Sequence, residues 1–104
     1  MAYNVVVTSE AEADLDRFIK YLVIEKESMQ AATSLLNDFE EMIDLLKFAA
    51  HSLKYCENDS LKAHGYRRMN FRRHNYFILY RVIDDLVIID NIFHDLQDYE
   101  NILR

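Results

Sequence analysis

The chain has 104 residues, of which 51% are apolar and 29% charged, and its formal net charge is −6. This length and composition indicate a globular chain, and we expect one domain over residues 1–104. The only glycine is Gly65, and this excludes the P-loop, the GxGxxG dinucleotide turn and the GxSxG nucleophile elbow, which all need more than one glycine. Cys56 is the only cysteine, so an intrachain disulfide and a cysteine-based zinc site are excluded as well.

The sequence also gives expectations about compartment and cofactors. No apolar run approaches the ~18 residues of a membrane span, and the N-terminus lacks a basic segment followed by an apolar one. We therefore expect a cytoplasmic protein without membrane contact. The four histidines form no HxxxH or HxxE pair, so we expect neither a metal nor another cofactor.

The first half of the chain predicts a short strand and two helices. Residues 3–7 are rich in β-branched side chains and predict a strand. Ser9 and Glu12 have the spacing of a capping box, which predicts a helix that runs to about Glu25. Ser28 can cap a second helix, and the short link between the two predicts a helical hairpin. The apolar positions of the second helix keep spacings of three and four residues: Ala32, Leu35, Leu36, Phe39, Met42, Ile43, Leu46 and Ala50.

The second half predicts strands and a terminal helix. Residues 66–72 alternate, with Met69 and Phe71 on one face and Arg68 and Arg72 on the other, as in a half-exposed antiparallel strand. Residues 76–82 are almost wholly apolar, which favours a central strand covered on both faces. Asp84 and Asp85 then form a turn. We also expect a polar loop over residues 56–60, a strand over 86–93 and a helix over 95–104, so that the order is strand, helix, helix, three strands, helix.

Half of the positive charge lies in one segment. Residues 62–81 carry six of the twelve Lys and Arg side chains and no acidic residue. Such a block favours a surface that binds a polyanion or an acidic partner. The alternative is a basic strand that lies beside acidic helices and pairs with them internally. The six cations are Lys62, Arg67, Arg68, Arg72, Arg73 and Arg81.

Three stretches carry a resemblance to a known family. They are G-Y-R-R-M-N-F at 65–71, Y-F-I-L-Y-R-V-I-D-D-L-V-I-I at 76–89 and I-F-H-D-L-Q-D-Y at 92–99. With the strand and helix before them, they resemble the RelE/ParE superfamily of toxins from bacterial type II toxin–antitoxin modules, which are associated with plasmid stabilisation. The resemblance implies an α+β fold, in which a small antiparallel sheet packs against an N-terminal helical hairpin and carries a basic groove. It also implies a growth-inhibiting toxin that forms a hetero-oligomer with a cognate antitoxin.

The superfamily divides by target. RelE-like and YoeB-like members cut mRNA in the ribosomal A site, whereas ParE-like members inhibit DNA gyrase without an enzymatic reaction. For this chain we favour a ribosome-dependent mRNA endoribonuclease (an mRNA interferase). A ParE-like gyrase inhibitor, or an inactive relative that only binds its antitoxin, remains open.

The nuclease hypothesis assigns roles to particular residues. His94 matches the histidine at the end of the last strand in YoeB-like and some ParE-like members, and imidazole titrates near neutral pH, as an acid or base in RNA cleavage must. Alternatively, His94 forms a hydrogen bond with Asp98, four residues later, at the start of the terminal helix. Arg68 matches a basic position of the nuclease groove, and it would hold the scissile phosphate together with Arg72 on the same strand face. Further contacts to nucleic acid or antitoxin are expected from Lys62, Arg67, Arg73, Arg81, Tyr66 and Tyr99, the tyrosines as stacking platforms or, alternatively, as core residues.

Overall fold

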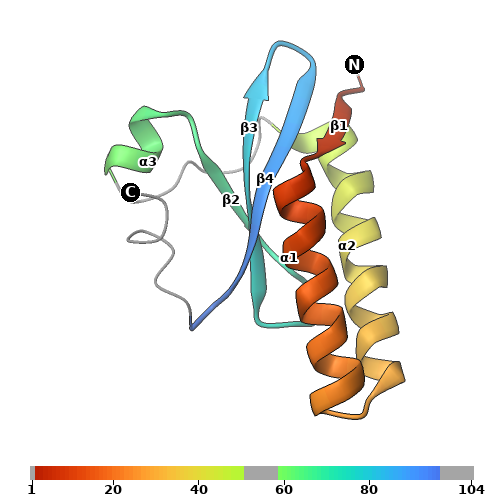
Figure 1. Ribbon diagram of the computed structural model, residues 1–104. Helices are drawn as coiled ribbons and strands as arrows, with labels where there is room; N and C mark the ends of the chain where they lie inside the picture. The colour runs from red at the N-terminus through yellow and green to blue at the C-terminus, as the bar shows by residue number, and fades with distance from the viewer. Residues whose placement is uncertain (1, 51–58, 97–104) are drawn as a thin grey trace.

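A four-stranded sheet with a helical hairpin on one face forms the body of the protein (Figure 1). The computed structural model describes residues 2–50 and 59–96. In chain order the elements are β1 (Asn4–Val7), α1 (Ser9–Lys20), the π-helical segment η1 (Tyr21–Glu25), α2 (Met29–Ala49), α3 (Asp59–Ala63), β2 (Arg67–Asn70), β3 (Tyr76–Ile83) and β4 (Leu86–His94).

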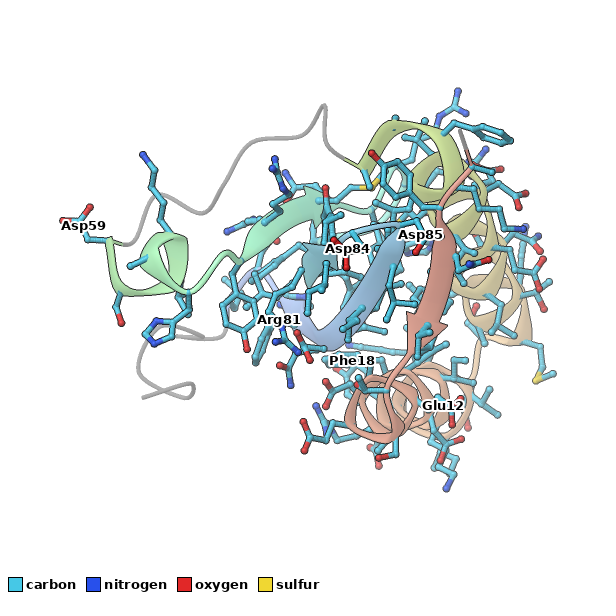
Figure 2. All side chains as sticks on the ribbon, turned by 90° about the horizontal axis from the view of Figure 1, so that it is seen from above. Glu12, Phe18, Asp59, Arg81, Asp84 and Asp85 are labelled. Carbon is cyan, nitrogen blue, oxygen red and sulfur yellow. The ribbon has the colours of Figure 1, made fainter. Side chains whose placement is uncertain are left out.

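The strands follow the order β1-β4-β3-β2. The pairs β2–β3 and β3–β4 are antiparallel, as expected, and a turn at Asp84 and Asp85 joins β3 to β4 (Figure 2). Asp84 has a φ of 54°, a conformation that a short carboxylate side chain tolerates. The expectation of an antiparallel sheet is wrong for β1, which pairs in parallel with β4. The alternation of side chains along a strand is the same in both kinds of pairing and does not fix strand direction.

Side-chain alternation gives the sheet two distinct faces. Helices α1 and α2 lie against one of them, the helix face, while α3 lies on the other side of the sheet, the outer face (Figure 1). Tyr76, Ile78 and Tyr80 of β3 join the core beneath the hairpin. Phe77 and Leu79 join a smaller outer cluster that includes Leu61 of α3 and Phe93 of β4. The expected central strand, buried on both faces, is therefore confirmed for residues 76–80.

The helix starts follow from side-chain caps. Ser28 caps α2 as expected, since its hydroxyl accepts a hydrogen bond from the Ala31 N–H at 3.0 Å. The expected cap at Ser9 is wrong, because Thr8 caps α1 and accepts from the Ala11 N–H at 3.1 Å. The Thr8 hydroxyl also lies 3.0 Å from the carbonyl oxygen of Ile89. This contact across the sheet favours Thr8 over its neighbour as the cap.

Two further expectations change in the second half. The strand expected over residues 66–72 ends at Asn70, and residues 72–75 form a bend that carries Arg72 away from the strand. A short helix, α3, replaces part of the expected polar loop at residues 59–60. Of the expected terminal helix, Asp95 and Leu96 form a turn, and residues 97–104 lie outside the described residues.

The shift of the cap from Ser9 to Thr8 is testable. Replacing Thr8 with Val keeps the side-chain volume but removes the cap, and we expect it to lower the free energy of unfolding by about 1–2 kcal/mol. The matched control is Ser9→Ala at the exposed first position of α1, with an expected change within about 0.5 kcal/mol. Urea unfolding followed by circular dichroism measures both. A larger loss of stability for the Ser9 variant than for the Thr8 variant would show that Ser9 is the N-cap of α1, as the capping-box spacing predicts.

Candidate interaction site

The three residues expected to form a catalytic group lie in three different places. Arg68 belongs to β2 and projects from the outer face, because it is paired with Leu79 in the register. His94 ends β4 opposite Tyr76, a residue of the helix face. Arg72 lies in the bend after β2, beside α2. The expectation that Arg72 shares a strand face with Arg68 is therefore wrong.

Arg68 lies flat on the apolar surface of the outer face. Its guanidinium carbon is 3.7 Å from the ring centroid of Phe77, and its Nε donates to Asn70 Oδ1 at 3.1 Å. A terminal nitrogen is 3.5 Å from a carboxylate oxygen of Asp95. The side chain is one-third exposed, so this cation is accessible from the outer face but is already held by three neighbours.

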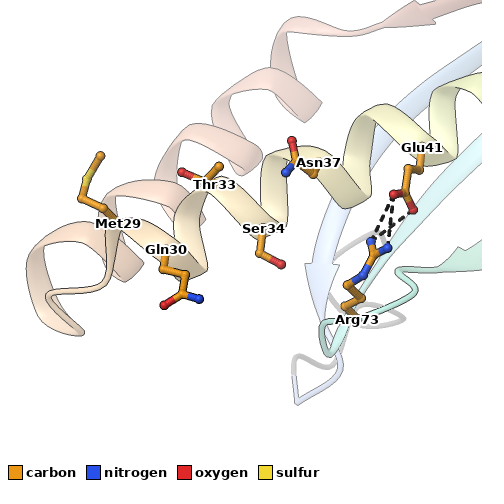
Figure 3. A pocket seen from close by; sticks show the side chains of 7 residues that line it. All are labelled: Met29, Gln30, Thr33, Ser34, Asn37, Glu41 and Arg73. Atoms are coloured by element: carbon orange, nitrogen blue, oxygen red, sulfur yellow. Dashed lines mark hydrogen bonds and ion pairs between the residues drawn. The ribbon is translucent and has the colours of Figure 1, made fainter.

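Arg73 connects the bend after β2 to helix α2. Its backbone N–H donates to Asp38 at 2.8 Å, its guanidinium donates to the same carboxylate, and it also pairs with Glu41 at 3.1 Å (Figure 3). The hydrogen bonds that the Arg73 guanidinium donates to Glu41 and then to Asp38 raise its pKa. Asp38 itself is fully buried. Arg72 approaches the same Glu41 at 3.9 Å and is 76% exposed.

The remaining expected contacts are held in similar ways. Arg81 donates from Nε to Asp90 at 2.7 Å, and this bond raises the pKa of its guanidinium. The guanidinium of Arg81 also lies 5.7 Å from the ring of Tyr66, a partly buried residue packed against the outer cluster. Arg67 is buried to 8% exposure. Lys62 lies on α3, and Tyr99 lies outside the described residues.

The basic segment is thus largely neutralised within the molecule. Within the part of the chain that the structure describes, four of its cations lie within 4 Å of a carboxylate, which is what the internal-pairing alternative expects. Two of these carboxylates come from α2 and two from β4 or the turn after it. The four cations are Arg68, Arg72, Arg73 and Arg81.

His94 is part of a cavity that the sequence did not indicate. We call this cavity, of about 490 Å³, the aromatic cup. It is lined by Arg17, Phe18, Tyr21, Tyr76, His94 and Leu96. Phe18 and Tyr21 are three residues apart on one side of α1 and η1, a spacing that is equally typical of core residues and therefore gives no distinct signal.

Hydrogen bonding and packing fix the ring of His94. Its Nδ1 accepts from the Leu96 N–H at 3.1 Å, so the neutral ring carries its proton on Nε2. The ring stands edge-on to Tyr76, with centroids 5.0 Å apart and planes at 90°. Burial, and then the nearby Tyr21, raise the pKa of Tyr76, so its hydroxyl keeps its proton at neutral pH.

A second, more polar cavity of about 470 Å³ runs along α2. Figure 3 shows its lining side chains on successive turns of the helix, with Arg73 at one end. The neighbouring His74 bonds through Nε2 to Ser34, 3.0 Å away, which ties the bend after β2 to the helix a second time. Within the described residues, no three His, Cys, Asp or Glu side chains are placed to hold a metal ion. In the same ranges no helix has the length and apolar character to span a membrane.

Two solved structures share the fold. The chain aligns with a chromosomal ParDE toxin–antitoxin system from P. aeruginosa at a TM-score of 0.67 and 20% identity, over 89% of this chain and 96% of that one. It aligns with the RelBE2 toxin–antitoxin complex from Mycobacterium tuberculosis at a TM-score of 0.61 and 22% identity, over 90% of this chain and 99% of that one.

The family itself follows from the sequence model for the ParE toxin of the type II toxin–antitoxin system parDE, which matches residues 5–99. The chain belongs to this family and is a type II toxin. No curated protein sequence matches it. The resemblance drawn from residues 65–99 is therefore confirmed at the level of the superfamily and of the toxin class.

The bond between Asp38 and the bend after β2 gives a stability prediction. Asp38→Ala removes a buried carboxylate and leaves the Arg73 N–H without its acceptor, so we expect a loss of about 1.5–3 kcal/mol in the free energy of unfolding. Asp44→Ala is the matched control, because Asp44 is 76% exposed on the same helix and pairs only loosely with Lys47. Thermal and urea unfolding measure both variants. Equal effects would show that the buried bond adds nothing.

Proposed function

We propose that this toxin arrests growth by binding DNA gyrase rather than by cutting mRNA, and that a cognate antitoxin silences it. The observation that carries the proposal is the separation of Arg68, Arg72 and His94. Cleavage of RNA by internal transfer needs a base, an acid and cations around one phosphate, all within hydrogen-bonding reach. Arg68 lies on the outer face, His94 lies opposite Tyr76 of the helix face, and Arg72 lies in the bend beside α2.

The internal pairing of the cations also supports gyrase binding over RNA cleavage. A nuclease groove needs positive charge that is available to the phosphates of its substrate. Here Arg73 and Arg81 are committed to carboxylates of the same chain, and the net charge of the chain is −6. A protein partner, by contrast, is bound by apolar patches with few charges at their centre.

An antitoxin partner is supported by the relatives. The two solved structures of the same fold are, by their descriptions, a toxin–antitoxin system and a toxin–antitoxin complex. A flexible, acidic segment of such a partner can pair with those cations of residues 62–81 that remain exposed, such as Arg72. The complex is then a hetero-oligomer.

Induced expression without antitoxin separates the two targets. We expect growth arrest with an early fall in thymidine incorporation and filamentous cells, because gyrase inhibition blocks replication first. The purified chain should inhibit supercoiling by gyrase, measured on agarose gels, and should leave ribosome-bound mRNA uncut in primer-extension assays. An early fall in methionine incorporation with cut mRNA would contradict the proposal, and normal growth at confirmed expression would favour an inactive relative.

A single substitution tests the mechanism further. Arg72→Gln removes an exposed cation that the nuclease hypothesis places on the scissile phosphate. Loss of such a group from a nuclease costs about 10²-fold or more in rate. For a gyrase inhibitor we expect Arg72→Gln to keep its toxicity within about twofold in a titrated-expression growth assay, with an unchanged melting temperature. Abolished toxicity in a folded variant would restore Arg72 to a functional site.

A further inference from the structure

We propose that the aromatic cup is the socket for an aromatic side chain of the antitoxin, flanked in the antitoxin by a carboxylate that pairs with Arg17. The inference rests on the proposed antitoxin partnership and names the anchor point of that partner. The aromatic cup lies on the helix side of the sheet, where η1 passes the end of β4, and it does not include any cation of residues 62–81.

The walls of the cup favour a ring over an aliphatic side chain. Phe18 and Tyr76 have centroids 4.6 Å apart with planes at 59°, and His94 stands edge-on to Tyr76. Successive rings are thus tilted rather than stacked, and they present both faces and edges to the cavity. A further ring can add tilted or edge-to-face contacts, which contribute beyond the apolar area they bury.

The rim of the cup is apolar and exposed. Tyr21 is 46% exposed and Leu96 is 90% exposed, although both line one cavity. Exposed apolar residues that occur singly are ordinary, but those that border a shared concave site mark an interaction surface. An entering side chain would cover both residues at once.

The charge at the rim of the cup favours an acidic residue next to the aromatic side chain of the antitoxin. Among the described residues that line the cup, Arg17 is the only one with a permanent charge, and its side chain is 58% exposed. Its guanidinium lies 5.0 Å from the ring centroid of Phe18 and pairs with Asp14 at 3.3 Å, one turn earlier on the helix. Asp14 is only 15% exposed and also accepts a hydrogen bond from the Ile92 N–H, but the five N–H donors of Arg17 leave room for a second carboxylate. The complementary ligand is therefore aromatic with an adjacent acid.

Short peptides test the chemistry of the cup on the intact chain. The probes are acetyl-Asp-Trp-Asp-amide and the control acetyl-Asp-Ala-Asp-amide, titrated in the millimolar range into the isotope-labelled protein. We expect the tryptophan peptide to shift the ring signals of His94 and Tyr76 through its ring current and the alanine peptide to leave them in place. If neither peptide shifts the ring signals of His94 and Tyr76, or if a leucine peptide shifts them as much as the tryptophan peptide does, the proposal is wrong.

Matched variants then locate the site. Tyr21→Ala removes one wall, and we expect about tenfold weaker binding of the tryptophan peptide and of the antitoxin. Ile24→Ala is the control, because Ile24 belongs to the same η1 segment and is 67% exposed but does not line the cup. Arg17→Glu should weaken both ligands, whereas Lys20→Glu, which also breaks an exposed pair on α1, should not. Circular dichroism confirms that all four variants fold.

The antitoxin arm separates this inference from the proposed function. Calorimetry uses the full-length toxin and the antitoxin expressed from the adjacent reading frame. If the wild-type chain does not bind that protein, the proposed partnership fails and the occupant named here fails with it. If the wild type binds and the Tyr21→Ala and Arg17→Glu variants bind equally well, only the aromatic cup is overturned.

Discussion

Burial of β3 on both faces is the constraint on which the rest of the structure depends. From Tyr76 to Tyr80 every side chain is buried, with alternate residues packed beneath the helical hairpin and in the outer cluster. Because β2 and β4 pair with β3 in a fixed register, each of their residues is assigned to one face, and a shift by one residue would exchange all of them. The positions of Arg68 and His94 on opposite faces are a direct consequence of this register.

A second constraint is the way in which an acidic protein accommodates a basic segment. Arg73 lies in the bend after β2 and reaches the buried Asp38 of α2, so a charged pair and a backbone hydrogen bond together hold the bend against the hairpin. Desolvation of a carboxylate is costly unless its oxygens are bonded, and here both oxygens are. Part of the positive charge concentrated in residues 62–81 therefore stabilises the fold.

The sequence predicted those elements whose signals are local. The helical spacing from Ala32 to Ala50, the cap at Ser28 and the wholly apolar strand at 76–80 each depend on neighbouring residues, and the structure confirms them. The parallel pairing of β1 was not predictable in this way, because it depends on contacts more than 80 residues apart. The same applies to the cap at Thr8, whose hydroxyl is selected by the carbonyl of Ile89 on another strand.

The candidate site shows why a list of chemically suitable residues does not define a site. Arg72 and Arg68 are four residues apart and would share a face if β2 continued, but the strand ends at Asn70 and Arg72 lies in the bend, near Glu41 of α2. His94, conversely, meets Phe18 and Tyr21, residues far away in the sequence that helical spacing assigns to an ordinary core face. The imidazole thus lines a cavity whose described residues are mainly aromatic, with Arg17 as the one cation among them. Such surroundings suit the recognition of a side chain better than transfer of a proton to a phosphodiester, because they supply apolar contact area and few charges to stabilise a developing anion.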